Sequence, residues 1–72
     1  MTKIQFPNNL IALRKREGMS IEVFSEKFGV SKNTIYNYEN SHYMPSVDFL
    51  IKIKLEYGLN IDDFLFKRNY IV

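Results

Sequence analysis

A three-residue pattern occurs three times in this 72-residue chain: a glycine, an apolar residue, and then a serine or asparagine. The glycine suits the left-handed position that ends a helix, and the serine or asparagine can accept an unpaired N–H group in the first turn of the next helix. In each case a second apolar residue follows at the spacing of a hydrophobic staple. The three copies with their staple partners are Gly18-Met19-Ser20 with Phe24, Gly29-Val30-Ser31 with Ile35, and Gly58-Leu59-Asn60 with Phe64.

These signals, with Pro7 and Pro45 as further breaks, predict five helices at about residues 8–17, 21–28, 32–39, 46–57 and 61–66. Apolar residues alternate from Phe49 to Tyr57 as in a strand, but the segment follows Pro45 and ends before Gly58, so we predict a helix. The predicted fold class is all-α, a compact five-helix bundle. The expected core residues are Leu10, Ile11, Leu13, Phe24, Phe28, Ile35, Tyr38, Val47, Leu50, Ile53, Ile61, Phe64 and Leu65.

Length and composition exclude several classes of protein. We expect one domain over residues 1–72, with a core at 7–66 and a short tail at 67–72. The chain has no cysteine and a single histidine, His42, so we expect no disulfide and no metal site. No nucleophile–base set or phosphate-binding glycine loop is visible, so we expect neither an enzyme nor a cofactor. The apolar runs are short and the N-terminus lacks a signal core, which predicts a cytoplasmic protein that does not enter a membrane.

The net charge of +2 is mild, and its distribution says more than its size. Basic residues cluster at 14–16, Lys27 and Lys32 flank the central glycine turn, and Asp62 and Asp63 lie far along the chain. This distribution is compatible with nucleic-acid binding but also with an ordinary solvated surface.

The segment from Gly29 to Asn37 carries the most specific chemistry. Gly29 permits a sharp reversal, Val30 fills the space between two helices, and Ser31 caps the second of them. Polar side chains then gather on one side of that helix. Lysine can reach guanine acceptors or phosphate, asparagine can pair with adenine, and threonine can contact a thymine methyl group. The residues in question are Lys32, Asn33, Thr34 and Asn37, and on these residues alone an ordinary polar helix surface remains the alternative.

The sequence from Leu10 to Phe66 resembles the phage lambda repressor/Cro-like (XRE-type) helix-turn-helix family. The resemblance covers about four-fifths of the chain and rests on the full order of spaced features. It implies a five-helix bundle whose third helix enters the DNA major groove, and a transcriptional regulator of bacterial or phage type. The matching pieces are Leu13-Arg14, Gly18-Met19-Ser20, FSEKFGVSKNTIYNYEN, Pro45-Ser46-Val47, Gly58-Leu59 and Ile61-Asp62-Asp63-Phe64-Leu65.

Roles are carried over from the family position by position. The resemblance implies a pair between Arg14 in the first helix and Glu39 at the end of the third. The residues implied to read bases are Lys32, Asn33, Thr34, Tyr36 and Asn37. Those implied to approach DNA phosphates are Ser20, Ser31, Asn40, His42 and Tyr43.

Two departures from the family pattern stand out. Many relatives carry glutamine where this chain has Ile21, so the contact of that glutamine should be missing. The fourth helix also has Lys54 and Leu55 in place of a small apolar and a polar residue, and it is apolar over more surface than one core can cover. Such surface suggests a partner, and we expect a homodimer on a palindromic site. The expected interface comprises Phe49, Ile51, Leu55, Phe66, Tyr70 and Ile71, extended by the tail to Val72. The alternative is that these residues close over the single core.

Two other interpretations stay open at this point. The chain could be a protein-interaction module, or an antitoxin-type protein, that kept the fold with weak or no DNA binding. It could also be a fragment of a longer regulator with a separate ligand domain.

Overall fold

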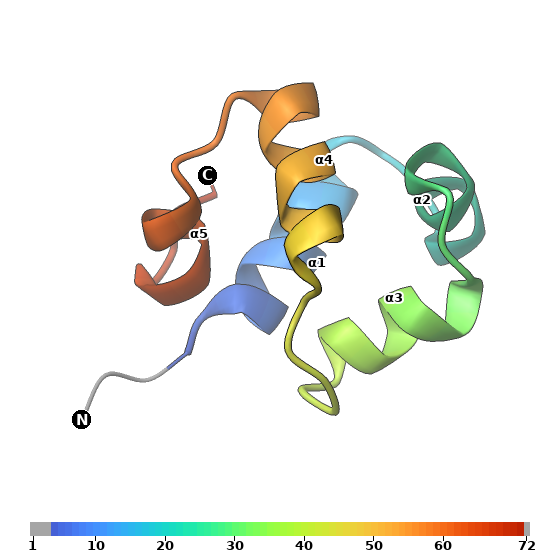
Figure 1. Ribbon diagram of the computed structural model, residues 1–72, viewed down its shortest axis with the longest axis horizontal. Coiled ribbons are helices and arrows are strands. Elements are labelled where there is room, and N and C mark those ends of the chain that lie inside the picture. The colour runs from blue at the N-terminus through green and yellow to red at the C-terminus, as the bar shows by residue number, and fades with distance from the viewer. Residues whose placement is uncertain (1–3, 72) are drawn as a thin grey trace.

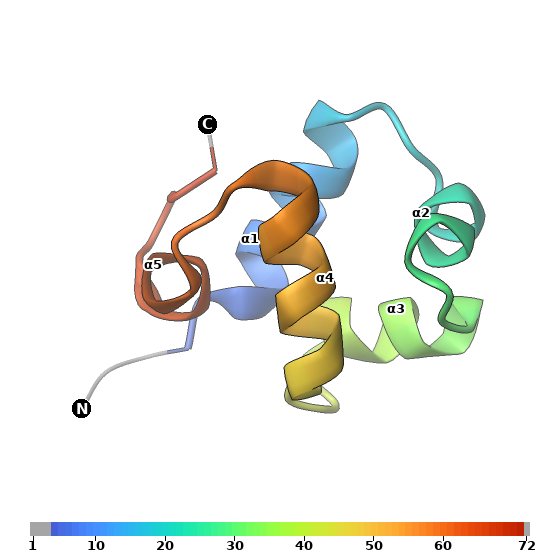
Figure 2. The ribbon, with the colours of Figure 1, turned by 45° about the horizontal axis from the view of Figure 1, so that its top comes forward.

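The computed structural model describes residues 4–71, which form five helices and, over that range, no strand (Figure 1). Helices α1 and α4 occupy the middle of the molecule, with α5 on one side and α2 and α3 on the other, and a second view shows the same arrangement (Figure 2). Helix α3 packs against α1 and α2, whereas α5 packs against α1. The bounds are α1 Phe6–Arg16, α2 Ile21–Phe28, α3 Lys32–Glu39, α4 Val47–Tyr57 and α5 Ile61–Phe66.

The expected all-α class and five-helix count are confirmed, with small changes at two helix starts. Helix α1 begins at Phe6 rather than residue 8, because Pro7 lies in its first turn, where a missing N–H group costs no hydrogen bond. Helix α4 begins at Val47 because Ser46 is its cap rather than its first residue. No helix within residues 4–71 is long and apolar enough to cross a membrane.

Four of the helices begin with the same local device. The side-chain oxygen of the capping residue accepts the backbone N–H group three residues later, which satisfies one of the donors that a helix start leaves free. The distances are 3.1 Å from Val23 to Ser20, 3.1 Å from Thr34 to Ser31, 3.1 Å from Phe49 to Ser46 and 3.0 Å from Asp63 to Asn60. The three helix starts expected from the repeated pattern are therefore confirmed.

An aromatic cluster centred on Phe6 fills the middle of the core. Its ring lies edge-on to Tyr38, Phe49 and Phe64, with centroid separations of 5.6, 6.4 and 5.6 Å. These three partners come from α3, α4 and α5, so one side chain of α1 contacts three other helices. Phe6 is not among the core residues expected from the sequence. The buried apolar residues are Phe6, Leu10, Leu13, Phe24, Phe28, Ile35, Tyr38, Phe49, Ile53, Leu59, Phe64 and Ile71.

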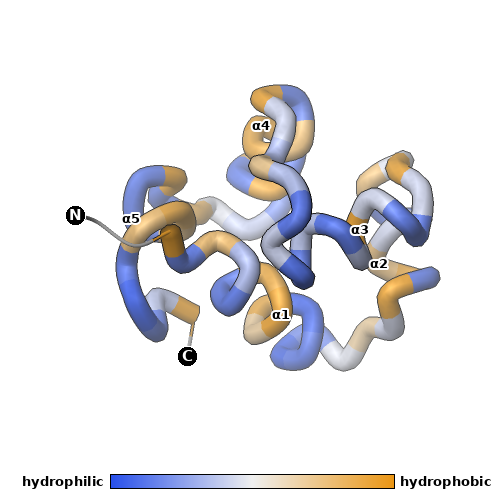
Figure 3. The backbone as a smooth tube through the Cα atoms, turned by 90° about the horizontal axis from the view of Figure 1, so that it is seen from below, coloured by the Kyte–Doolittle hydropathy of each residue, from blue (hydrophilic) through white to orange (hydrophobic). Residues whose placement is uncertain are grey.

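The core residues expected from α4 are partly wrong. Val47 was expected to be buried, but it is 73% exposed, and Phe49 replaces it with 1% exposure. Residues two apart on a helix point to nearly opposite sides, so Phe49 and Ile53 face inward while Val47 faces outward. The strand-like alternation is thus the signature of a helix with apolar residues on two sides. Hydrophobic and hydrophilic stretches alternate along α4 in Figure 3. Leu50, Ile61 and Leu65, also expected in the core, are half-buried and pack against its margin. Ile11 is half-buried.

Two residues of the expected dimer surface are wrong for that role. Phe49 packs against the rings of Phe6 and Tyr38, and Ile71 is buried in the core of the same chain. Near the tail, the Tyr70 hydroxyl accepts a 2.9 Å hydrogen bond from the backbone N–H group of Asn60. In this packing neither Phe49 nor Ile71 is exposed to a second copy. Val72 lies outside the described residues.

Asn9 is a buried polar residue that the sequence pattern did not reveal. Its side-chain amide nitrogen donates to the carbonyl oxygens of Phe64 and Lys67, both at 2.9 Å. These carbonyls lie at the C-terminal end of α5, where helix geometry leaves acceptors unpaired. Asn9 therefore fastens α5 to α1 and offsets its own burial with two hydrogen bonds.

We predict that Tyr57→Phe leaves the protein as stable as before or more stable, by about 1 kcal/mol. The buried Tyr57 hydroxyl finds no hydrogen-bond partner within residues 4–71, and burial raises the pKa of this phenol above its usual 10.0. The folded state thus holds the proton more tightly than the unfolded chain. The part of the free energy of unfolding that is linked to this proton is fully present below about pH 10 and is lost as the pH rises further. Tyr57→Phe should reduce that loss.

Urea unfolding at pH 7 and at pH 10.5 measures both effects. Tyr70→Phe is the matched control, because it removes a hydroxyl that does accept a hydrogen bond. It should destabilise the protein by about 0.5–1.5 kcal/mol. A loss of stability in Tyr57→Phe equal to that of the control would contradict the prediction.

Candidate nucleic-acid interface

The turn between α2 and α3 has the geometry that its sequence predicted. Gly29 adopts φ +66°, and its N–H group donates to the Glu26 carbonyl at 3.2 Å. The following N–H group, of Val30, donates to the Ser25 carbonyl at 3.1 Å, and the Val30 side chain packs against the core. A side chain at position 29 would be strained whatever the space around it, since L-residues rarely adopt this φ. The turn therefore sets a fixed angle between α2 and α3.

Helix α3 has an inner face and an outer face. Ile35 and Tyr38 are buried, and the Tyr38 hydroxyl accepts a 3.3 Å hydrogen bond from the backbone of Ser46 at the start of α4. The outer face carries most of the residues that the sequence assigned to base reading. Lys32, Asn33 and Tyr36 are exposed, whereas Thr34 and Asn37 are half-buried.

Arg14 and Glu39 form the expected pair, in a two-point geometry. Nε of Arg14 lies 2.7 Å from one carboxylate oxygen of Glu39, and Nη2 lies 3.1 Å from the other. The remaining Nη1 donates to the Met19 carbonyl at 3.0 Å. The two side chains are only 14% and 6% exposed, which shields their attraction from water. Arg14 therefore joins α1, the end of α3 and the approach to α2.

The loop after α3 is organised around the end of that helix. His42 donates its backbone N–H group to the Asn37 carbonyl at 2.9 Å, and its Nδ1 lies 3.0 Å from the side-chain oxygen of Asn37. The imidazole also lies edge-on to the Tyr36 ring, at 6.3 Å. With its oxygen engaged by the imidazole, Asn37 presents its amide N–H groups, which suit a base acceptor. The two-point contact with adenine expected from the sequence would require His42 to release that oxygen.

Several residues expected at phosphates are also engaged in local hydrogen bonds. Ser20 and Ser31 cap α2 and α3, and the Ser31 hydroxyl lies 2.8 Å from that of Thr34. The Asn40 side-chain amide donates to the Tyr36 carbonyl at 2.8 Å. Tyr43 is exposed in the loop. The side chains of Ser20, Ser31 and Asn40 therefore already form hydrogen bonds at helix ends.

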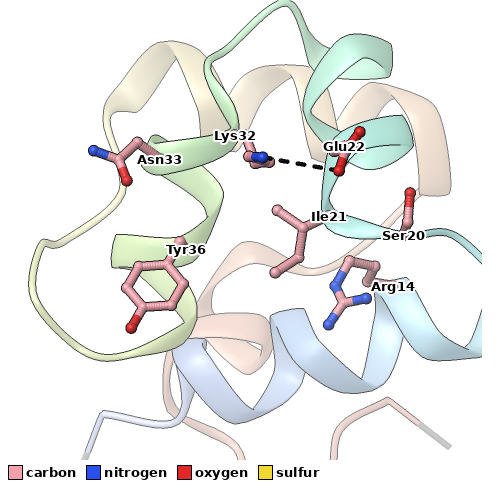
Figure 4. A pocket seen from close by; sticks show the side chains of 7 residues that line it. All are labelled: Arg14, Ser20, Ile21, Glu22, Lys32, Asn33 and Tyr36. Carbon is pink, nitrogen blue, oxygen red and sulfur yellow. Dashed lines mark ion pairs between the residues drawn. The ribbon is translucent and has the colours of Figure 1, made fainter.

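Two lysines near the central turn have different surroundings. Lys32 lies 3.8 Å from Glu22, and both side chains are largely exposed, so the ion pair is weak and Lys32 remains accessible (Figure 4). Lys27 instead faces α4, where its hydrogen bond to Glu56 at 2.9 Å raises the pKa of the lysine above its usual value. The position of Glu22 at this site has no signal in the sequence, because an acid in a first helical turn is ordinary.

The part of the chain that the structure describes contains no group of three or more His, Cys, Asp or Glu side chains that could hold a metal ion.

Known proteins share the fold and the family pattern of this chain. The helix-turn-helix family HTH_3 matches residues 10–64. The crystal structure of a transcriptional regulator from Listeria innocua superposes with a TM-score of 0.80 at 26% sequence identity, covering 97% of this chain. The chain spans 63% of the length of that structure. No curated protein sequence matches significantly. The match over residues 10–64 shows that the chain belongs to the lambda repressor-like (XRE-type) helix-turn-helix family of DNA-binding domains.

Proposed function

We propose that this protein is a sequence-specific transcriptional regulator that binds double-stranded DNA with α3 in the major groove. The observation that carries the proposal is the two-faced α3, whose inner side is anchored by Tyr38 and by the Arg14–Glu39 pair while its outer side is polar. A rigidly held helix with polar residues facing out can present hydrogen-bonding groups to base edges in a fixed register. The similar regulator from Listeria innocua supports the same role.

In this proposal the residues divide between affinity and specificity. The expected base readers are Lys32, Asn33, Tyr36 and Asn37, with Thr34 at the margin because its hydroxyl contacts Ser31. Backbone N–H groups at the start of α2, together with Ser20, His42 and Tyr43, approach phosphates and supply the salt-dependent part of binding. Selection of bound sequences from a random double-stranded DNA pool tests the proposal directly. An enriched motif supports it, and no enrichment contradicts it.

We predict that Asn37→Ala loses discrimination at one base pair, by about 1–3 kcal/mol per half-site, with little change on random DNA. The reason is that Asn37 faces outward with free amide N–H groups, which a base acceptor can pair. Titrations of the selected site and of point-substituted sites measure the effect. Asn8→Ala is the matched control, since Asn8 is exposed on α1. Equal losses on specific and random DNA would contradict a base-reading role.

A homodimer remains part of the proposal, with a revised surface. The outer side of α4 forms a stripe of Val47, Ile51 and Leu55, spaced four residues apart, and the last is 79% exposed. An antiparallel two-fold contact centred on Ile51 would set Val47 against the partner's Leu55. At the margin of this interface we place Phe66, which is exposed, and Tyr70, which is half-buried. Such a pair would present two copies of α3 about 34 Å apart, one turn of DNA.

We predict that Leu55→Glu abolishes this dimer without destabilising the fold. The side chain is exposed, so the change costs little within one copy, but a dimer would bury an unpaired carboxylate. Sedimentation over a range of concentrations measures the oligomeric state, and thermal unfolding of the monomer checks the fold. Val23→Glu, also at an exposed apolar residue, is the control and should still dimerise. A wild-type chain that sediments only as a monomer would refute the dimer.

A second candidate function is protein interaction without DNA binding, as in an antitoxin-type module. Two features favour it: the exposed apolar stripe on α4, and Glu22, which competes with DNA for Lys32 by pairing with it. Gel shifts on random DNA at low and then at high salt separate the two candidates. Binding at low salt that weakens at high salt supports the DNA-binding role, whereas no binding at low salt supports the interaction module.

A further inference from the structure

A hollow of about 560 Å³ opens between the start of α2 and the outer face of α3 (Figure 4). It adjoins Lys32 and Asn33, so it lies on the same surface as the proposed base readers. Its lining residues are Arg14, Ser20, Ile21, Glu22, Lys32, Asn33 and Tyr36.

Two of the polar side chains around this hollow are already engaged within the protein. All three guanidinium nitrogens of Arg14 donate to Glu39 or to Met19, and the Ser20 hydroxyl caps α2. What remains at the centre is the half-buried side chain of Ile21, with the Tyr36 ring on the α3 side, as Figure 4 shows. The middle of the hollow therefore offers an apolar surface within a polar rim.

The DNA major groove offers a matching group. Among the atoms that base pairs expose there, the 5-methyl group of thymine is the apolar one, and side chains recognise it by van der Waals contact. Resting on the proposed function, we infer that the hollow receives a thymine 5-methyl group against Ile21 and Tyr36. Ile21 thereby determines specificity at one base pair, where a glutamine at this position would have offered a polar contact.

The charges on the rim allow a base edge as the occupant. Arg14 is neutralised by Glu39, whereas Lys32 is 65% exposed and its ammonium can exchange its 3.8 Å contact with Glu22 for a DNA acceptor. The hollow thus places one apolar contact beside an accessible cation, on the same surface as the proposed base readers, which suits a thymine beside a phosphate chain.

Deoxyuridine provides the test, because it differs from thymidine only by the missing methyl group. The full chain first selects its site from random DNA, and each thymine of that site is then replaced in turn by uracil. We expect one replacement to weaken wild-type binding by about fourfold, the value of one buried methyl group. With Ile21→Ala the two DNAs should bind almost equally, whereas Ile21→Val should keep most of the difference.

Val23→Ala is the matched control. Val23 is an exposed apolar residue of the same helix and does not line the hollow, so the thymine-to-uracil ratio should stay at the wild-type value. Thermal unfolding of each variant checks that it folds. If uracil has no effect at any position, or Ile21→Ala keeps the full ratio, the inference is overturned while DNA binding stands. If the chain selects no DNA, the proposed function and the inference both fall.

Discussion

Arg14→Ala is expected to lower the free energy of unfolding by about 3–5 kcal/mol. The substitution removes three hydrogen bonds at once and leaves the Glu39 carboxylate, 6% exposed, without its cation. A charge isolated in a largely buried position is costly because water cannot solvate it. Urea unfolding measures the loss, which is a large part of the total stability of a domain of this size.

The double variant Arg14→Met with Glu39→Leu is the control that separates pairing from packing. Because it removes both charges, it should recover most of the stability that Arg14→Ala loses. Arg14→Lys should fall between, since an ammonium cannot make the two-point contact. A loss below about 1 kcal/mol in Arg14→Ala would show that the pair behaves like an exposed ion pair. In any variant that stays folded, weaker specific DNA binding would indicate that the pair also positions α3.

Phe6→Ala is expected to cost about 3–5 kcal/mol, the range for truncating a buried aromatic side chain. Phe6 is fully buried, and its ring contacts Tyr38, Phe49 and Phe64 edge-on. Such aromatic contacts add to the energy of burial, and the cavity left by alanine would open at the meeting point of four helices. Thermal and urea unfolding both report the change.

Phe66→Ala gives the matched comparison, because Phe66 is 44% exposed and lies at the end of α5. Its truncation should cost much less than that of Phe6. The comparison is best made at low protein concentration, where any dimer contact of Phe66 does not contribute. Equal losses in the two variants would contradict the central place assigned to Phe6.

The helix pattern could be predicted because its determinants are local. Caps and left-handed glycines act within a few residues of one another, so Ser31 and Gly29 define the central turn wherever the rest of the chain lies. The exceptions came from tertiary packing. The first helix is expected to begin after Pro7, but Pro7 lies inside α1 because an earlier start allows Phe6 to be buried. In α4, Phe49 is buried in place of Val47 because tertiary packing decides which side of the helix faces the core. No local sequence signal reports that choice.

In the candidate site, too, some features could be predicted and others depend on tertiary packing. The Arg14–Glu39 pair could be predicted from the family resemblance, since it links two helices whose arrangement the family shares. The contact between Asn37 and His42 could not, because it depends on the path of the loop and on side-chain rotamers. The hollow at Ile21 likewise needs the surfaces of two helices. From the sequence, Ile21 indicated only a missing polar contact.

The division of α3 into two faces has a consequence for how such proteins diverge. Lys32 and Asn33 are exposed and take no part in anchoring the helix, so they can change from one relative to another at little cost in folding stability. A change at Asn37 has a wider effect, because its side chain forms a hydrogen bond with His42. In an alignment of relatives that bind different DNA sites, positions 32 and 33 should vary with the site, whereas positions 37 and 42 should change together.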